Sequence, residues 1–418
     1  MAYPVAWQKV AIRELYEGLY DGPHATPKPS DQGPVFLGIG NITDDGHLDL
    51  KSVRHISESE FGRWTRRVTP SEGDIVFTYE ATLNRYAIIP KGFKGCLGRR
   101  LALIRPNPRK VDTRFLHYYF FGHEWRNLIE EKKLSGATVD RIPLTEFPNF
   151  PVVLPPLETQ RRISSILSAY DDLIENNTRR IEILEEMARR LYEEWFVQFR
   201  FPGHEGVKFK ESELGLIPEG WDLVPLGDIY RTGSGGTPSR KNPEFYGGDY
   251  RWVKTKELQD CPVFDTEERI SEEGLKKSSA KLFPRNTVLI AMYGATIGRL
   301  GVLQEESATN QACCAILPNS QGCGWGYAYL SLFSRRQALI DLRAGAAQQN
   351  ISQDVIKRFR LLRASDELHN QFEMAVTPFL TLCFALYRKN VNLRAQRDLL
   401  LPKLISGEID VSDIPMPT

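Results

Sequence analysis

The 418-residue sequence lacks the short motifs that mark common enzyme active sites. It has no G-x-x-x-x-G-K-[ST] phosphate loop, no G-x-S-x-G nucleophile elbow and no H-E-x-x-H zinc motif. The [DNS]-P-P-[YFW] signature of adenine methyltransferases is also missing, because Pro155-Pro156 is followed by Leu157. A nuclease-type D/E-x-K triplet occurs at residues 130–132, but such triplets are common by chance. These absences favour a binding protein over an enzyme.

The sequence also lacks the marks of a metal protein, a secreted protein and a membrane protein. Its six cysteines form no Cys-x-x-Cys pair and have no histidine at zinc-like spacing. We expect them to be buried free thiols in a reducing compartment. The N-terminus has no signal pattern. The most apolar stretch, residues 375–387, contains Pro378 and is shorter than the roughly 20 residues of a membrane span. The expected protein is soluble and cytoplasmic.

A strong excess of positive charge is missing as well. The formal net charge is +1. Proteins that coat nucleic acid without sequence preference are usually clearly basic, so this balance argues against that class. It remains compatible with a locally basic surface, or with partners that supply part of the phosphate contacts.

Two stretches of the sequence repeat one another. Residues 70–89 (PSEGDIVFTYEATLNRYAII) align with residues 284–303 (PRNTVLIAMYGATIGRLGVL). Identities fall at Pro70/Pro284, Tyr79/Tyr293, Ala81/Ala295, Thr82/Thr296 and Arg85/Arg299. Flanking matches extend from Trp7-x-x-Val10 with Trp221-x-x-Val224 to Gly136-Ala137 with Gly345-Ala346. Because the matches keep their order, we interpret the chain as a duplicated two-part module.

Each copy begins with a globular part and ends with a long helix. Short apolar runs bounded by turn residues, such as 74–79, 101–104 and 288–292, predict strands. Residues 114–131 and 325–342 predict helices. The predicted fold class is α+β, with two similar mixed α/β domains separated by two long helices packed as an antiparallel coiled coil. The predicted boundaries are 1–157 for the first domain, 158–200 for the first helix, 201–220 for a turn-rich linker, 221–365 for the second domain, and 366–418 for the second helix and C-terminal tail.

The two helices carry apolar residues at alternating spacings of four and three, the pattern of a coiled coil. We expect the two seams to pack on each other, because one seam alone would leave an apolar stripe exposed. Arg397 is one weak layer in the second seam. The predicted seams are Ile163, Leu167, Tyr170, Ile174, Asn177, Ile181, Leu184, Ala188, Leu191 and Trp195, and, 209 positions later, Phe372, Val376, Phe379, Cys383, Leu386, Asn390, Leu393, Arg397, Leu400 and Leu404.

One asparagine interrupts each seam. If the helices are antiparallel with their seams centred, Asn177 faces Asn390. A buried amide pair satisfies its own hydrogen bonds, whereas one asparagine against leucine leaves a polar group unpaired at about 1–3 kcal/mol. We therefore predict that the two side chains meet near the middle of the helix pair and fix its register and orientation.

Three loops that recur in the same order in both copies carry side chains suited to DNA. Arginine pairs with guanine, asparagine and glutamine pair with adenine, and lysine and threonine more often contact phosphates. For any single residue, a solvated loop or turn is an open alternative. The candidate DNA-binding residues of the first copy are Thr78, Tyr79, Arg85, Arg99, Arg100, Thr138 and Arg141. Those of the second copy are Lys254, Lys256, Tyr293, Thr296, Arg299, Asn310, Gln311, Gln348, Gln349 and Asn350.

Four aromatic residues, Trp195, Phe196, Phe199 and Phe201, lie at the end of the first predicted helix. They could form a platform on which bases stack. Packing at the junction between helix and linker is the interpretation that we favour.

Several segments together resemble the specificity subunit of type I restriction–modification systems. LYEEWFVQFRFPGH (residues 191–204) and SELGLIPEGW (residues 212–221) are similar to the central segment of that family. GGTPS (235–239), GATIG (294–298) and LPPL (154–157) resemble further family signatures, as does LLPKLISGE (400–408). In the first domain, DGPHATP (21–27) replaces the GGTP of the second, and Gly98-Arg99 stands where the second copy has Asn310-Gln311.

The resemblance implies a subunit that reads double-stranded DNA and performs no catalysis. Each target-recognition domain would read one half of a two-part site, and the helices would set the gap between the halves. Two methyltransferase subunits would dock on the helices and methylate adenine with S-adenosylmethionine. Motor–nuclease subunits would add ATP- and Mg²⁺-dependent restriction. None of these cofactors is expected in this chain.

Two other functional classes stay open at this stage. One is a nuclease or methyltransferase with an unrecognised site, which would act on DNA alone in the presence of Mg²⁺ and a methyl donor. The other is a coiled-coil adaptor whose domains bind protein, and which would show no sequence-dependent DNA binding.

Overall fold

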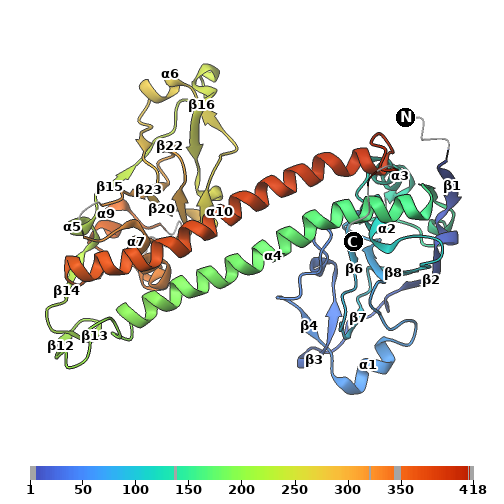
Figure 1. The fold of residues 1–418 in the computed structure, drawn as a ribbon, viewed down its shortest axis with the longest axis horizontal. Helices are drawn as coiled ribbons and strands as arrows, with labels where there is room; N and C mark the ends of the chain where they lie inside the picture. Colours follow the sequence, from blue (N-terminus) through green and yellow to red (C-terminus); the bar gives the residue numbers. More distant parts are fainter. Residues whose placement is uncertain (1–5, 136–138, 320–321, 343–349, 413, 415–418) are drawn as a thin grey trace. The chain divides into compact units, whose positions relative to one another are not determined.

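A computed structural model describes residues 6–135, 139–319, 322–342, 350–412 and 414. The chain divides into two compact units, residues 1–174 with 392–418 (unit 1) and residues 175–391 (unit 2). Each unit therefore contains one globular domain and a part of both long helices. These helices, α4 (Leu157–Phe196) and α10 (Asp366–Ile405), are green and red in Figure 1. No helix in the described residues is long and apolar enough to span a bilayer.

The domain of unit 1 contains two main sheets, with strand orders β2-β8-β5-β6 and β4-β3-β7. Two smaller pairs, β1-β11 and β9-β10, flank them. The strands are β1 (Gln8–Ala11), β2 (Tyr16–Asp21), β3 (Ser30–Leu37), β4 (Arg54–His55), β5 (Ile75–Thr78), β6 (Tyr86–Ile88), β7 (Gly95–Leu97), β8 (Leu101–Pro106), β9 (Leu134–Ser135), β10 (Asp140–Arg141) and β11 (Pro151–Leu154). The helices are α1 (Glu58–Trp64), α2 (Thr113–Tyr119) and α3 (His123–Lys132), with 3-10 turns η1 (Ile12–Leu15), η2 (Ile39–Asn41) and η3 (Phe147–Asn149).

The domain of unit 2 has sheets of order β15-β23-β20-β21-β17 and β18-β16-β22-β19, with the pairs β14-β24 and β12-β13 beside them. The strands are β12 (Phe209–Ser212), β13 (Gly215–Pro218), β14 (Asp222–Pro225), β15 (Thr232–Ser234), β16 (Tyr246–Val253), β17 (Cys261–Val263), β18 (Arg269–Ile270), β19 (Leu282–Phe283), β20 (Val288–Ala291), β21 (Leu300–Leu303), β22 (Ser307–Thr309), β23 (Cys313–Ile316) and β24 (Arg360–Arg363). The helices are α5 (Leu226–Ile229), α6 (Glu272–Lys276), α7 (Trp325–Ser334), α8 (Arg336–Asp341) and α9 (Gln353–Arg358), with 3-10 turns η4 (Pro243–Phe245), η5 (Thr255–Glu257) and η6 (Gly294–Thr296).

The two domains share one topology, which confirms the duplication. The order β2-β8-β5-β6 corresponds to β15-β23-β20-β21, and β4-β3-β7 corresponds to β18-β16-β22. In both copies the middle strand of the smaller sheet pairs in parallel with the next strand, β3 with β7 and β16 with β22. Each domain also closes an antiparallel pair between its first and last strands, β1 with β11 and β14 with β24. The second copy adds β17 and β19 at sheet edges.

The central strand of each domain separates two hydrophobic cores. In β5, Ile75 and Phe77 pack in the core that includes Ile163 of α4, whereas Val76 packs in the core of Leu37. Strand β20 divides in the same way between the core of unit 2 and a smaller core. Successive side chains of a strand point to opposite faces, so a strand buried on both faces must be apolar throughout. This explains the unbroken apolar runs that predicted these strands.

Each of the two predicted domain helices is broken into two. Residues 114–131 form α2 and α3, which are separated at Gly122, and residues 325–342 form α7 and α8, which are separated at Arg335. A Cβ atom at Gly122 would lie 3.0 Å from the Tyr119 carbonyl oxygen and 3.2 Å from Ile405. The close approach of α10 therefore leaves little space for a side chain where the chain turns. The predicted turn-rich linker likewise contains an unpredicted hairpin, β12-β13.

Along both helices the predicted seam positions are buried or half-buried. In unit 1, Ile163 and Leu167 of α4 share a core with Leu404 of α10. In unit 2, Ala188 and Trp195 share a core with Phe372 and other residues of α10. Within each unit α4 and α10 therefore pack against each other, in the antiparallel sense that the sequence predicts.

The weak layer at Arg397 is compensated by a polar network in unit 1. The Arg397 guanidinium lies 2.6 Å from a carboxylate oxygen of Asp171 on α4. The other Asp171 oxygen accepts a hydrogen bond of 2.5 Å from the hydroxyl of Tyr118 on α2. A half-buried charge is tolerated where an opposite charge and a hydrogen-bond donor satisfy it. The network also joins the first domain to both helices.

The predicted asparagine layer is present in unit 2. The Asn177 side-chain nitrogen donates a hydrogen bond of 2.8 Å to the Asn390 side-chain oxygen, and both residues are buried. Asn390 in turn donates to the Thr178 hydroxyl at 3.2 Å. In the same unit the Trp195 ring lies 5.5 Å from the Phe372 ring, so the contacting residue on α10 has a lower number as α4 advances. The two contacts together confirm the register and the antiparallel orientation.

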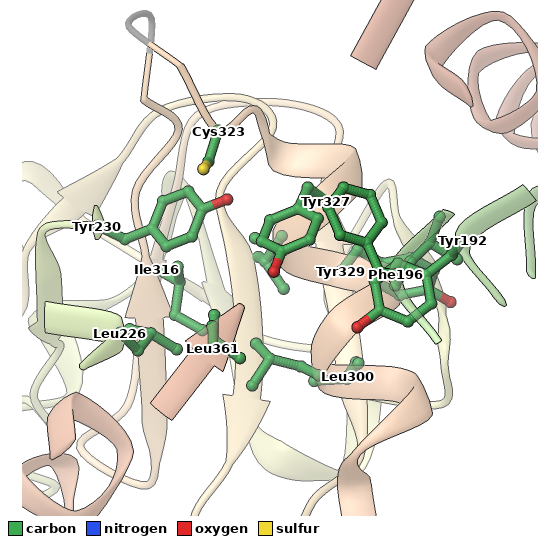
Figure 2. Packing of buried hydrophobic residues seen from close by; sticks show 14 of the residues in the cluster. Tyr192, Phe196, Leu226, Tyr230, Leu300, Ile316, Cys323, Tyr327, Tyr329 and Leu361 are labelled. Atoms are coloured by element: carbon green, nitrogen blue, oxygen red, sulfur yellow. The ribbon is translucent and has the colours of Figure 1, made fainter. Parts of the chain in front are cut away.

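The aromatic residues at the end of α4 are packed rather than presented for stacking. Phe196 is buried and lies 4.7 Å from the Tyr327 ring and 5.0 Å from the Phe372 ring. Figure 2 shows Phe196 and Tyr192 of α4 beside Tyr327 of α7 in the core of unit 2. Packing at the junction is therefore the correct interpretation of this cluster. The cysteines are free, and all are buried except the half-buried Cys261.

The asparagine layer generates a stability prediction. Replacing Asn177 with leucine removes the donor to a buried amide, so we expect the free energy of unfolding to fall by about 1–3 kcal/mol. Replacing both Asn177 and Asn390 with leucine should restore stability or exceed it, at the expense of register specificity. Urea unfolding followed by circular dichroism measures both effects. The exposed neighbour Asn176, changed to leucine, is the control. Equal losses in the single and double variants would contradict the paired layer.

A buried histidine generates a pH prediction. His369 accepts a hydrogen bond from the Ala364 backbone at 3.1 Å and packs on Phe196, and burial lowers its pKa to about 4. Because the unfolded chain binds this proton near pH 6.5, stability should fall as the pH drops from 6.5 to 4, by about 3 kcal/mol at most. In the first copy the equivalent position holds Gln160, which does not titrate. We expect His369→Gln to reduce the pH dependence of thermal unfolding, with a remainder from His117, whose pKa burial also lowers to about 4. An unchanged slope would contradict this assignment.

Candidate nucleic-acid interface

The turn that follows β7 and the turn that follows β22 have the same backbone hydrogen bonds. Gly98 N donates to the Leu37 oxygen at 2.7 Å, and Asn310 N donates to the Val253 oxygen at 2.9 Å. Within each turn, Leu101 N bonds to the Gly98 oxygen at 3.1 Å, and Cys313 N bonds to the Asn310 oxygen at 3.3 Å. Across to the central strand, Tyr79 N bonds to the Arg100 oxygen, and Met292 N bonds to the Ala312 oxygen. These bonds make Arg99 equivalent to Gln311 in structure, and both are exposed.

Glycines hold the backbone beneath these turns. A Cβ atom at Gly22 would lie 2.0 Å from the Gly98 oxygen, and one at Gly235 would lie 1.8 Å from the Thr309 oxygen. Real Cβ atoms do not approach a carbonyl oxygen so closely, so both sites require glycine. The first copy therefore keeps the glycine contact although its DGPHATP segment departs from the GGTP of the second.

The loop after β5 and the loop after β20 differ in how they present their tyrosines. Tyr79 is 6% exposed and donates a hydrogen bond of 3.1 Å to the Arg99 backbone oxygen, and burial is the main cause that raises its pKa to about 12. Thr78 is also buried. Tyr293, by contrast, is 40% exposed. In this structure Thr78 and Tyr79 support the loops of the first domain, whereas Tyr293 presents surface.

The arginines that follow these loops are each held by an aspartate. Arg85 lies 2.6 Å from Asp44, and Arg299 lies 2.7 Å from Asp260. Both aspartates come from the segment after the middle strand of the smaller sheet, so the arrangement recurs in the two copies. A positive φ at Asn84 and Gly298, one residue before each arginine, shapes the turn. Asp260 also pairs with Arg336 of α8. Thr296, in η6 of the same loop, is half-buried.

The third predicted loop joins the second in each copy through one β-bridge. Arg141 pairs with Glu80, and Asn350 pairs with Tyr293. Arg141 is exposed and Asn350 is half-buried. The other candidates of this loop, Thr138, Gln348 and Gln349, lie outside the described residues.

The first domain has an open groove of about 430 Å³ beside the turn after β7. Arg99 and Arg100 line it together with Arg54 of β4 and Thr26. Arg100 is partly neutralised by Glu80 at 3.3 Å. Sequence reasoning missed Arg54, because only the folded sheet places β4 beside this turn.

The cations of the second domain are paired with glutamates near β18. Lys254 lies 2.8 Å from Glu268, and its hydrogen bond lowers the pKa of that carboxyl below the ordinary value. Lys256 pairs with Glu267. Arg240, which sequence reasoning missed, lies 2.7 Å from Glu268 and stacks on Tyr246 with its guanidinium carbon 4.2 Å from the ring centroid. Arg240 follows the GGTPS segment directly, and this proximity was the signal that could have revealed it.

The groups on these surfaces are suited to binding nucleic acid. Guanidinium, ammonium and amide groups at the ends of sheets can donate hydrogen bonds to phosphates and to base edges. Among the described residues, no group of histidine, cysteine, aspartate and glutamate side chains has an arrangement that could hold a metal ion.

Comparison with known proteins agrees with this picture. Residues 4–186 and 218–362 match the family described as type I restriction modification DNA specificity domain. The chain is 24% identical to the type I restriction enzyme HindI specificity subunit of Haemophilus influenzae, over 90% of this chain and 94% of that one. It is 24% identical to the MjaIX specificity subunit of Methanocaldococcus jannaschii, over 96% and 90% of the two chains.

The fold has a counterpart among solved structures. The S subunit of a type I restriction–modification system from M. genitalium superposes with a TM-score of 0.62 and 15% identity, covering 95% of this chain and 96% of that one. The sequence match extends over both domains and much of α4. The chain therefore belongs to the family of type I restriction–modification DNA specificity domains.

Proposed function

We propose that this chain is the DNA-recognition subunit of a type I restriction–modification complex. Each domain reads one half of a two-part DNA site, and partner subunits carry out adenine methylation and restriction. The observation that carries the proposal is the pair of equivalent turns at Arg99 and Gln311. The two turns share one pattern of backbone hydrogen bonds but carry side chains that prefer different bases. Two domains that read different half-sites require such a difference.

The chain itself supplies recognition and no chemistry in this proposal. S-adenosylmethionine, ATP and Mg²⁺ bind to methyltransferase and motor–nuclease partners, and the complex works in the cytoplasm. Support comes from the family match and from relatives that are named as specificity subunits. On this chain the arginine–aspartate pairs position guanidinium groups before DNA arrives. The preorganised guanidinium groups lose less conformational freedom on binding DNA, while each aspartate competes with a DNA phosphate for the same guanidinium.

Exchange of one domain tests whether the two domains recognise their half-sites independently. We expect that replacing residues 221–362 with the matching domain of another specificity subunit changes one half of the methylated sequence and leaves the other half unchanged. The measurement is single-molecule sequencing of adenine methylation on DNA exposed to the chain and its methyltransferase partner. A change in both halves would refute independent reading by the two domains.

Controls separate the competing functions. The purified chain alone, with DNA, Mg²⁺ and S-adenosylmethionine, should neither methylate nor cleave, and activity there would favour an enzyme. Absence of sequence-dependent binding, even with the methyltransferase present, would favour a protein-binding adaptor.

Two equivalent leucines on the long helices support a pair of docking sites. Leu173 of α4 is 45% exposed and Leu382 of α10 is 43% exposed, and each lies directly before a buried seam residue. They are 209 positions apart, which is the offset between the two seams. Large apolar side chains exposed on both copies at one position fit two identical partners, and we propose two methyltransferase subunits.

Stoichiometry tests this docking scheme. We expect Leu173→Asp to leave one methyltransferase subunit per chain, Leu382→Asp likewise, and the double variant to bind none. A buried charge at an apolar contact should weaken each site by at least tenfold. Light scattering coupled to size exclusion measures the mass of the complexes. Arg179→Asp, on the charged side of α4, is the control. Full complexes from both single variants would refute the sites.

A further inference from the structure

The turn after β7 and its counterpart after β22 contain only three positions that could carry base specificity. They are the pairs 98/310, 99/311 and 100/312, which the matched backbone hydrogen bonds define. Their backbone hydrogen bonds match in the two copies, so we look to the side chains for a difference in specificity. Each pair can be assessed by what its side chains already contact.

Both residues of the first pair, 98/310, serve the structure of the turn itself. At Gly98 a Cβ atom would lie 2.4 Å from the Leu37 carbonyl oxygen, so the first copy has no room for a side chain there. In the second copy the Asn310 side-chain oxygen accepts a hydrogen bond of 3.1 Å from Ala312 N. Asn310 therefore closes its own turn, as asparagine commonly does.

The third pair is unsuited to reading bases in both copies. Arg100 is bound to Glu80 at 3.3 Å and its side chain is 29% exposed. Its counterpart Ala312 has no hydrogen-bonding side chain. A position that selects bases in both domains needs donors or acceptors in both, and this pair does not supply them.

The middle pair is exposed and chemically informative in both copies. Among the residues that the structure describes, no carboxylate pairs with Arg99, whereas Arg85 and Arg100 are paired. The Gln311 side-chain oxygen accepts a hydrogen bond from the Thr237 hydroxyl. That contact orients the amide while its nitrogen remains available as a donor and its oxygen keeps a second lone pair. An arginine fork matches guanine O6 and N7, and a glutamine amide matches adenine N6 and N7.

We propose that position 99 in the first domain and position 311 in the second are the base-selecting positions, with Arg99 selecting a guanine in one half-site and Gln311 an adenine in the other. This assignment rests on the proposed function. The supports of each turn reinforce it. Tyr79 anchors the Arg99 backbone oxygen, and Gly22 and Gly235 pack the backbone below. A side chain on so fixed a turn reaches one base pair in a defined geometry.

The test uses the full complex with its methyltransferase partner. Methylation mapping first defines the two half-sites, and the domain exchange described above assigns each half to its domain. Binding is then measured by competition with DNA duplexes in which every base pair of each half-site is changed in turn. We expect the wild-type complex to lose roughly 5- to 150-fold in affinity when the guanine read by Arg99 is replaced.

In the Arg99→Gln variant, the loss of affinity on replacing the guanine read by Arg99 should vanish. The losses at the other base pairs should stay unchanged. Arg99→Lys keeps the charge but not the fork, so it should retain overall affinity and still lose the guanine preference. Gln311→Arg should move the preference at one pair of the other half-site from adenine to guanine. Arg109→Gln removes an exposed arginine at the opposite end of β8 and should alter no base preference.

The outcomes separate this inference from the proposed function. Unchanged base preferences in all three variants overturn the assignment, and so does a loss of affinity that is uniform over all duplexes, because that pattern identifies a phosphate contact. In either case a bipartite wild-type methylation site would leave the proposed function standing. A wild-type complex without a bipartite site would remove the proposed function itself.

Discussion

Burial of the apolar seams of α4 and α10 is the interaction on which the rest of the molecule depends. A 40-residue helix with an apolar stripe is not stable in water by itself, because the stripe would remain exposed. Each seam covers the other, and each globular domain adds its own side chains to the same core. Ile163 packs with the first domain in unit 1, and Phe372 packs with the second in unit 2. In each unit the two helices thus share one hydrophobic core with one face of the main sheet of the domain.

Duplication solves the packing problem and the recognition problem together. The second copy supplies the partner helix that the first copy needs, and it supplies a second reading domain with the same sheets. Because the framework is carried by buried strands and by glycine contacts such as those of Gly22 and Gly235, the exposed turns are free to diverge. Arg99 and Gln311 illustrate this division, since they share a backbone position and differ in chemistry.

The features that follow from local periodicity could be predicted from the sequence. They include the duplication, the central strands, both seams and the contact of Asn177 with Asn390. What could not be predicted depends on contacts between distant segments that no periodic pattern marks. Gly122, at the break between α2 and α3, lies close to Ile405 of α10, and the partner of Arg85 is an aspartate about forty residues away. The difference in exposure between the buried Tyr79 and the exposed Tyr293 has the same origin, because these aligned residues have different neighbours in their two domains.

The paired cations have a consequence for how such a protein searches DNA. Arg85, Arg299 and Lys254 each rest on a carboxylate of their own domain, so a phosphate that approaches them must displace an internal anion instead of releasing only salt ions. Under the proposed function, contact with the DNA backbone alone therefore gains little free energy, and binding at such sites should be brief. Residence becomes long only where base edges add their own hydrogen bonds. The carboxylates of the protein thus compete with DNA phosphates for the same cations, which shortens the time spent on DNA that lacks the recognised bases.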